Sequence, residues 1–192
     1  NLFNPHMLIP ELEPDRVAVE ANRAVASGIE LSVTRLRGEG IWSWTGNYTS
    51  GRTRDRVDAR WIPRRFDQQH TVNLISTWEG GRWTFSVAGA WHSGWALTKL
   101  PGVLPFDDPP ATTLRNNSRL RSFGSLDARL AFEQPVGRGS LTAFVEVTNL
   151  VNRTNDGGVD YEVEVEDGNF VLAEVDLEPI FPLVTSAGIV WR

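Results

Sequence analysis

The sequence predicts an all-β fold of antiparallel strands, and three observations support this prediction. Long helical periodicity is missing, and short segments instead alternate between apolar and polar residues. Gly, Pro, Asn and Asp recur between these segments, where they favour turns. The connections alternate between tight glycine-containing turns and loops of roughly 15 to 30 residues.

The first two strands are predicted on either side of a tight turn. Residues 29–34 alternate apolar and polar side chains, and Gly38-Glu39-Gly40 follows as a turn. Residues 41–49 (IWSWTGNYT) then place Trp42, Trp44, Gly46 and Tyr48 in one phase. A long polar loop is expected at 52–68 (RTRDRVDARWIPRRFDQ).

The next hairpin has a tryptophan-rich apolar phase. Residues 70–78 lead into a turn at Glu79-Gly80-Gly81, with Ile75 as the one exception to the alternation. In the strand that opens at residue 82 (RWTFSVAGAWH), Trp83, Phe85, Val87, Gly89 and Trp91 share a phase. This strand is expected to run to about Trp95, before a loop rich in proline and aspartate that ends near Arg119.

The last strands repeat the arrangement. Residues 126–133 turn at Gly137-Arg138-Gly139 into 140–149, where Phe144 is the exception. A third long connection, 152–182, contains a hairpin at 161–175 turned at Asp167-Gly168-Asn169. The chain finishes with a strand at 183–192, where Leu183, Ala187, Ile189 and Trp191 are in phase.

The asymmetry of the connections favours a transmembrane β-barrel. Short turns at one end and long loops at the other are typical of outer-membrane barrels, with periplasmic turns and extracellular loops. Seven strands cannot close such a barrel alone, and unpaired backbone amides in lipid cost several kcal/mol each. The sequence therefore predicts a barrel segment of about seven strands.

The aromatic residues fall into two predicted membrane-interface belts. Their rings are apolar while their polar edges can stay hydrated. From Trp83 to Trp91 is roughly 27 Å along the strand, or about 20 Å of height at a tilt near 40°. Trp95 is a further candidate for the outer belt, and the belt residues are Trp42, Trp44, Tyr48, Trp78, Trp83, Phe85, Trp91, Phe132 and Trp191.

The opposite phase carries Thr, Ser, Asn, Glu and Arg, which suits a hydrated barrel interior. The predicted lumen-facing charged residues are Glu30, Asp127, Arg129, Glu133 and Glu146. We expect them to contact an internal plug or water. The alternative interpretation is a soluble sandwich or lipocalin-like barrel, in which the same alternation would face a core crowded by large rings.

Composition excludes several classes. The net charge of -5 and pI near 5.2 argue against a nucleic-acid partner. Cysteine is absent, which removes disulfides, thiolate metal sites and cysteine nucleophiles. No stretch reaches the roughly 20 apolar residues of a membrane-spanning helix, and no signal segment is visible at the start. Because the chain begins at Asn1 and not at methionine, we treat it as a piece of a longer protein.

Three segments carry a family resemblance. Residues 22–33 (NRAVASGIELSV) resemble a strand written with an Arg/Gly-Val/Ile-Glu-Leu pattern, and 62–74 (IPRRFDQQHTVNL) resemble a Pro-Arg-x-x-Asp-Gln-x-His-x-Leu-x-Leu stretch. Residues 144–155 (FVEVTNLVNRTN) are similar to an Asn-Leu-Phe-Asn-Arg pattern that ends a penultimate strand. In this order, the segments resemble the C-terminal barrel portion of TonB-dependent outer-membrane receptors.

The resemblance covers nearly the whole chain, 1–192, and implies a barrel of about 22 strands filled by an N-terminal plug. Such receptors import scarce solutes, typically iron chelates, cobalamin or glycans, when TonB pulls on the plug. Plug and earlier strands lie outside this sequence. The last strand also resembles the signal that the barrel-assembly machinery reads, although Arg192 follows Trp191.

No catalytic site is predicted. His6, His70 and His92 lack an HExxH motif, a nucleophile elbow or a phosphate loop. Asp67 and His70 are expected to serve local hydrogen bonding at a strand entry, with an acid-base pair as the alternative. The acidic segment 156–178 is expected to be a solvated loop, with a divalent cation or basic ligand as the alternative. A basic group of six arginines is expected either to be solvated at the surface or to bind lipopolysaccharide phosphates or an anionic solute. Its members are Arg52, Arg54, Arg56, Arg60, Arg64 and Arg65.

The functional expectation is a TonB-dependent receptor of the outer membrane, without a cofactor, enzyme activity or metal. Its expected partners are outer-membrane lipid and lipopolysaccharide, the remainder of the receptor, TonB through the plug, and the assembly machinery. The C-terminus is expected in the periplasm. A small porin-like or structural barrel without a plug is the first alternative, and a soluble glycan-binding β-domain is the second.

Overall fold

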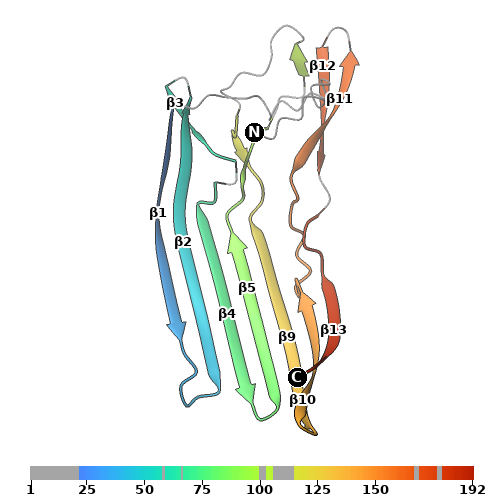
Figure 1. Cartoon of the computed structure of the whole chain (residues 1–192). Helices are drawn as coiled ribbons and strands as arrows, with labels where there is room; N and C mark the ends of the chain where they lie inside the picture. The colour runs from blue at the N-terminus through green and yellow to red at the C-terminus, as the bar shows by residue number, and fades with distance from the viewer. Residues whose placement is uncertain are drawn as a thin grey trace.

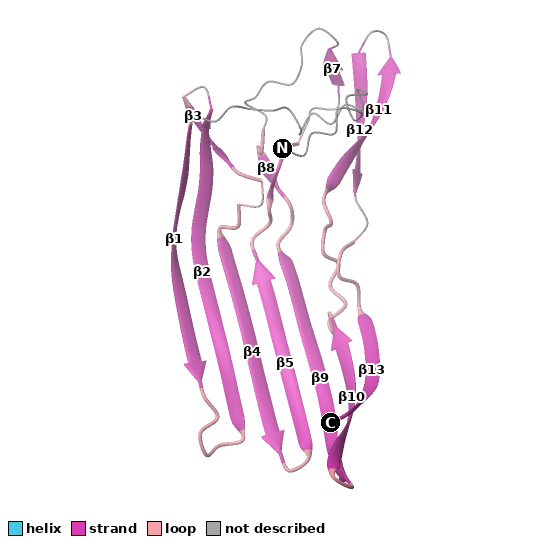
Figure 2. Cartoon of the chain, viewed as in Figure 1, coloured by secondary structure: helices cyan, strands magenta, loops and turns pink. Residues whose placement is uncertain are grey.

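The computed structural model describes residues 22–57, 59–65, 67–99, 103–105, 115–166, 169–176 and 179–192. Within these ranges every regular element is a β-strand, and all strand pairs are antiparallel (Figure 2). For these residues, the prediction of an all-β, antiparallel fold is therefore confirmed.

Seven long strands pair in chain order into one sheet. Figure 1 shows this sheet as a single layer, with the tight turns together at one end and the long connections at the other. The strands are β1 (Arg23–Arg35), β2 (Trp42–Val57), β4 (His70–Gly80), β5 (Trp83–His92), β9 (Phe123–Val136), β10 (Gly139–Thr148) and β13 (Val184–Trp191). The short strand β3 (Arg60–Pro63) adds to β2.

Glycines make the tight turns possible. Gly81 and Gly137 have φ of 60° and 58°, in the left-handed region that side chains with a Cβ rarely adopt. No atom lies within 4 Å of the position that a Cβ would take at either residue. The backbone conformation, and not crowding, therefore explains why glycine stands in these turns.

The predicted polar loop at 52–68 is wrong in its first part. β2 continues to Val57, pairs with β1 as far as Arg23↔Arg56, and folds back into β3. The polar composition of this segment favoured a loop, but its residues still alternate, and the start of β1 supplies backbone hydrogen-bond partners. The sheet therefore extends beyond the apolar region by several residues.

The two longest connections also contain short strands. β6 (Ala96–Leu97) pairs with β8 (Ser118–Arg119), and β7 (Val103–Pro105) adds to the edge of a hairpin. That hairpin is β11 (Val159–Glu166) with β12 (Asn169–Asp176), in the register Glu166↔Asn169. The hairpin predicted within 161–175 is confirmed, while Asp167 and Gly168 lie outside the described residues.

The few buried side chains lie near the long connections. Side chains on both faces of the sheet are exposed or half-buried, so the described residues form no core between two layers. The buried residues of the described ranges are Val57, Ile62, Ala96, Asp67, Asn116, Asn149 and Asn155. Packing therefore holds the connections at this end, while backbone ladders hold the sheet.

Candidate functional site

The register of the sheet collects most of the apolar side chains on one face. Residues paired across neighbouring strands share a face, so each row of partners can be followed through the sheet. One row runs through Leu31, Tyr48, Val72, Trp91 and Gly124. A second row runs through Trp42, Trp78, Phe85, Leu130, Val145 and Ala187. We call this surface the apolar face.

All nine predicted belt residues lie on the apolar face. Tyr48 and Trp91 share the row nearer the long connections. The other seven lie nearer the tight turns: Trp42, Trp44, Trp78, Trp83, Phe85, Phe132 and Trp191. The structure thus gives two aromatic rows separated by aliphatic and small residues. Their role at a membrane interface stays a prediction.

The assignment of Trp95 to the outer row is wrong. β5 ends at His92, so alternation no longer fixes the direction of a side chain three residues later. Trp95 stacks on His92 with ring centroids 5.2 Å apart, and His92 belongs to the opposite face. Its ring therefore lies with the polar side of the sheet.

The apolar face is open. The exposed fractions are 74% for Ile29, 48% for Leu74, 55% for Val145 and 70% for Ile189. Soluble monomers rarely expose a continuous apolar surface of this extent, because burying such side chains is worth roughly 1.5–3 kcal/mol each. The described chain thus has an apolar surface that requires a covering phase or partner.

Several polar groups on the apolar face have partners within the chain. Trp42 Nε1 donates to Ser76 Oγ at 2.6 Å, and the Arg35 guanidinium lies 5.1 Å from the Trp42 ring centroid. Tyr48 Oη and His70 Nδ1 are 2.9 Å apart. These contacts lower the cost of placing this face in an apolar medium.

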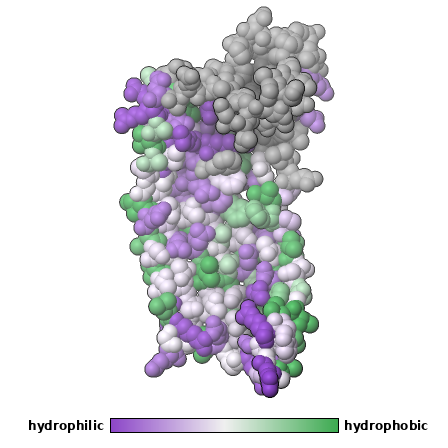
Figure 3. All heavy atoms as spheres, viewed as in Figure 1, coloured by the Kyte–Doolittle hydropathy of each residue, from purple (hydrophilic) through white to green (hydrophobic). Residues whose placement is uncertain are grey.

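The other surface, the polar face, carries cross-strand hydrogen bonds between side chains. Ser32 Oγ donates to Asn47 Oδ1 at 2.7 Å, and the Thr77 and Ser86 hydroxyls are 3.2 Å apart. In the view of Figure 3 the middle of the visible face is largely purple to white. The sheet is therefore amphipathic across its thickness.

The five predicted lumen-facing residues all lie on the polar face. Glu30 pairs with Thr49 and Glu133 with Thr142, while Arg129 lies across from Glu146 with an Nη1 to Oε2 distance of 3.0 Å. The remaining member, Asp127, accepts hydrogen bonds from Ser125 Oγ at 2.6 Å and from the Asn149 amide at 2.9 Å. The structure thus brings Arg129 and Glu146 together; that these five residues face a lumen stays a prediction.

Phe144, the exception to the alternation, is packed on the polar face. Its cross-strand partner is Gly188, where a Cβ would come within 2.7 Å of the Phe144 ring. The Arg129 guanidinium lies 4.0 Å from the centroid of the same ring. Glycine on β13 and arginine on β9 therefore accommodate this aromatic ring, a combination that strand alternation alone does not reveal.

A buried carboxylate ties strand β2, the β3–β4 connection and the β5–β9 connection together at the end away from the tight turns. Asp67, 4% exposed, accepts from the Thr53 amide and from Arg119 Nη2, each at 2.5 Å. Arg119 Nη1 also donates to the backbone oxygens of Asp67 at 2.8 Å and Gly94 at 3.0 Å. A Cβ on Gly94 would lie 1.7 Å from the Leu120 oxygen, so only glycine permits this approach. We call this group the Asp67 lock.

Two buried asparagines form a second attachment. Asn149 Nδ2 donates to the backbone oxygens of Arg153 and Phe181, both at 2.9 Å, and Asn149 Oδ1 accepts from the Arg153 amide at 3.0 Å. Asn155 exchanges two hydrogen bonds with the backbone of Gly124, at 2.9 and 3.0 Å. This asparagine lock joins the β10–β13 connection to the start of β9.

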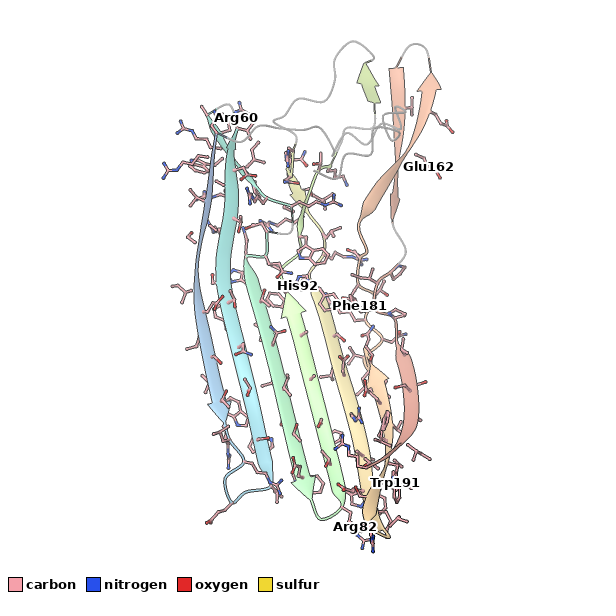
Figure 4. All side chains as sticks on the ribbon, in the orientation of Figure 1. Arg60, Arg82, His92, Glu162, Phe181 and Trp191 are labelled. Carbon is pink, nitrogen blue, oxygen red and sulfur yellow. The ribbon has the colours of Figure 1, made fainter. Side chains whose placement is uncertain are left out.

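Aromatic rings cover the polar face beside the asparagine lock. His92 stacks between Trp95 and Phe123, with 4.9 Å between the His92 and Phe123 centroids. Phe181 meets Phe123 edge-on at 5.7 Å, and Figure 4 shows His92 and Phe181 at the same level of the sheet. Sequence reasoning gave these residues no common role because they come from three distant segments.

Asp67 and His70 do not form an acid-base pair. Asp67 bonds to Thr53 and Arg119, whereas His70 contacts Tyr48 on the apolar face. His6 lies outside the described residues. Among the residues that the structure describes, no group of three or more His, Asp or Glu side chains is arranged to hold a metal ion.

The acidic segment 156–178 begins with an ion pair. The Arg121 side chain binds the Asp156 carboxylate through Nε and Nη2, and this hydrogen bonding lowers the pKa of Asp156 below 3.8. Glu162 and Glu164 on β11 are exposed. The cation or basic ligand considered for this segment stays untested.

No helix in the described ranges is long and apolar enough to cross a membrane. Comparison of the chain with protein-family models, with curated proteins and with solved structures finds no match.

Proposed function

We propose that this chain is the C-terminal barrel portion of a TonB-dependent outer-membrane receptor. In this proposal the apolar face contacts lipid and the polar face lines the interior. The receptor binds a scarce extracellular solute and imports it with energy transmitted by TonB. The chain itself contributes wall and rim, and carries no catalytic step.

The observation that carries the proposal is the division of the sheet into two chemically different faces. Every strand partner of an apolar-face residue again lies on that face, from Leu31 on β1 to Ile189 on β13. Polar residues with cross-strand hydrogen bonds occupy the other side. A membrane strand needs this division because lipid and a hydrated interior lie on its two sides.

The distance between the aromatic rows supports a membrane of ordinary thickness. The Trp83–Trp91 span of about 20 Å in height falls within an apolar band of about 25 Å with its interfacial girdles. The tight turns lie beyond one row and the connections beyond the other. In the proposed orientation the tight turns and the C-terminus are periplasmic.

The two locks support a receptor with ordered external segments. Asp67 belongs to 62–74, and both Asn149 and Asn155 belong to 144–155, which are two of the three segments that carry the resemblance. Each makes hydrogen bonds that hold a long connection against the rim. The resemblance therefore coincides with residues that have a clear physical task.

The proposal is tested with the full-length protein that contains this chain. Cells with and without its gene, each with and without TonB, are given labelled iron chelates, cobalamin and oligosaccharides. The proposal expects one solute class to accumulate only when both the gene and TonB are present. Uptake that is independent of TonB would favour the porin-like barrel. In a detergent partitioning experiment, a protein that stays in the aqueous phase would favour the soluble β-domain.

A further inference from the structure

We propose that four arginines at the end of the apolar face bind phosphate groups of membrane lipid headgroups. The site, called the arginine tier, consists of Arg23, Arg52, Arg54 and Arg56. The inference rests on the proposed function, because it needs the apolar face to lie in lipid. It goes further by naming a lipid chemistry and the residues that recognise it.

The strand register places the tier in continuation of the apolar face. Along β2 the phase of Trp44 and Tyr48 continues through Ser50 to Arg52, Arg54 and Arg56. On β1, Arg23 lies across from Arg56, and Val25 lies across from Arg54. This extension of β2, where a loop was expected, is what aligns the arginines on one side.

The six arginines of the predicted basic group are thus divided. Arg60 lies across from Val57, and Arg64 Nε bonds to Asp55 Oδ1 at 2.7 Å; Val57 and Asp55 both have the polar-face phase. Arg60 is labelled in Figure 4 at the β2–β3 turn. Arg65 lies in neither strand. Only three of the six share the apolar-face phase with Arg23.

Charge is segregated across these strands. The acidic residues of β1, β2 and β3 are Glu30 and Asp55, and both lie on the polar face. In the described ranges no carboxylate forms an ion pair with Arg52, Arg54 or Arg56. The tier therefore presents a formal charge of +4 next to an apolar surface, although the whole chain is negative.

The chemistry of the tier matches phosphate. A guanidinium can give two parallel hydrogen bonds to a phosphate, and all four arginines are exposed. Successive same-face positions on a strand lie about 7 Å apart, so neighbouring arginines can contact one headgroup together. Trp61, paired with Arg56, lies 5.6 Å from the Arg54 guanidinium and adds an amphipathic ring at the same level.

Position selects a lipid as the source of the phosphate. Arg52 lies four residues beyond Tyr48, about 14 Å along the strand or about 10 Å in height at a tilt near 40°. The headgroup region adds about 5–8 Å to each side of the hydrocarbon core. The long side chain of Arg52 can thus reach phosphates that the bilayer itself holds next to the apolar face, and the other three arginines continue the tier away from the hydrocarbon.

The test uses the full-length protein in vesicles of phosphatidylcholine with a minor fraction of lipid A. One vesicle set contains lipid A with both phosphates and the other contains the dephosphorylated form, and native mass spectrometry of the extracted protein measures bound lipid A. We expect Arg52→Gln with Arg54→Gln to weaken binding of the phosphorylated lipid about thirtyfold. The dephosphorylated lipid should bind both proteins equally weakly.

The matched control removes two charges elsewhere. In Arg60→Gln with Arg138→Gln, one charge is removed from the polar-face phase and one from a tight turn. This variant should alter binding less than about twofold. Equal binding by the tier variant and the parent protein would overturn the inference, as would displacement of the lipid by inorganic phosphate at matched concentration. Quenching of the apolar-face tryptophans by brominated lipid reports the proposed function separately. If the tryptophans are quenched but the arginine substitutions do not change lipid binding, only this inference is contradicted. If the tryptophans are not quenched, both this inference and the proposed function are contradicted.

Discussion

Single buried side-chain amides hold the rim of this sheet, which is its end at the long connections. Asn149 and Asn155 make five hydrogen bonds to backbone groups of β9 and of the β10–β13 connection. A buried backbone group that loses its partner costs about 1–3 kcal/mol, so each amide has a large effect for its size. These two side-chain amides therefore have a large part in holding the β10–β13 connection in place.

Asn149→Ala tests this role. Asn149 and Asn152 both adopt the left-handed region, with φ of 52° and 48°, but only Asn149 is buried. We expect Asn149→Ala to lower the free energy of unfolding about 2–3 kcal/mol more than Asn152→Ala, because both substitutions share the backbone strain. Denaturant titration in detergent measures the difference. Equal losses would mean that the side-chain hydrogen bonds contribute nothing.

The ion pair of Asp156 with Arg121 predicts that acid loosens the β10–β13 connection. Because Arg121 lowers its pKa in the folded protein, Asp156 binds fewer protons there than in the unfolded chain below neutral pH. Its contribution is complete above the unfolded value of 3.8 and is lost as the pH falls through the lower folded pKa. Limited proteolysis of this connection should therefore speed up below pH 3.8. In Asp156→Asn this acid-dependent step should be absent; an unchanged profile would contradict the assignment.

At the scale of single residues, sequence reasoning found part of the polar face and missed its contacts. Alternation alone placed Glu146 and Arg129 on one side, and the register then joins them at 3.0 Å. It did not explain Phe144, because the answer lies in Gly188 on a strand more than forty positions later. Interactions between distant strands depend on register, which a single strand's pattern does not define.

At the scale of strands, period-two alternation was a sufficient guide wherever it was accompanied by a tight turn. The seven long strands were all predicted, including β5 from its tryptophan-rich phase and β13 from its terminal aromatic. The extension of β2 was missed because charged residues were interpreted as a loop, although they alternate with Thr53, Asp55 and Val57. The partner strand β1 supplies the stabilisation that composition concealed.

Val145→Arg tests the division between faces within one strand. Val145 is 55% exposed on the apolar face, whereas Thr142 on the same strand lies on the polar face across from Glu133. An arginine in the lipid phase near the middle of the membrane costs about 2–4 kcal/mol, so Val145→Arg should strongly reduce assembled protein in vesicles. Thr142→Arg is the matched control and should assemble nearly normally. Equal assembly of the two variants would reverse the assignment of the faces.

Asp67→Asn tests how the locks act on whole connections. The substitution keeps the shape of the side chain but removes the charge that Arg119 and the Thr53 amide share. Breaking one side of a largely buried pair leaves the Arg119 guanidinium without its carboxylate partner, and we expect a loss of about 2–4 kcal/mol. Glu146→Gln alters an exposed pair and should cost about 0–1 kcal/mol. Thermal unfolding of both variants compares them, and a similar loss would argue against a lock.

At the scale of the whole molecule, the long strands that the structure describes form a single amphipathic layer, without the two-layer core of an ordinary soluble domain. The layer arrangement could be anticipated from the asymmetry of the connections, since tight turns at one end bring all seven strands into one sheet. The ordered rim could not, because its stability comes from buried amides and one buried carboxylate supplied by segments far apart in the chain. The apolar face of this layer defines which environment the molecule requires.

Nitroxide scanning of β4 tests the central assignment most directly. The chain contains no cysteine, so a single cysteine introduced between Thr71 and Thr77 carries the one label within this chain. In vesicles, the proposal predicts that labels at 72, 74 and 76 are accessible to oxygen dissolved in lipid. Labels at 71, 73, 75 and 77 should instead be accessible to a water-soluble nickel chelate. Uniform accessibility along β4, or the reverse alternation, would contradict a lipid-facing apolar surface.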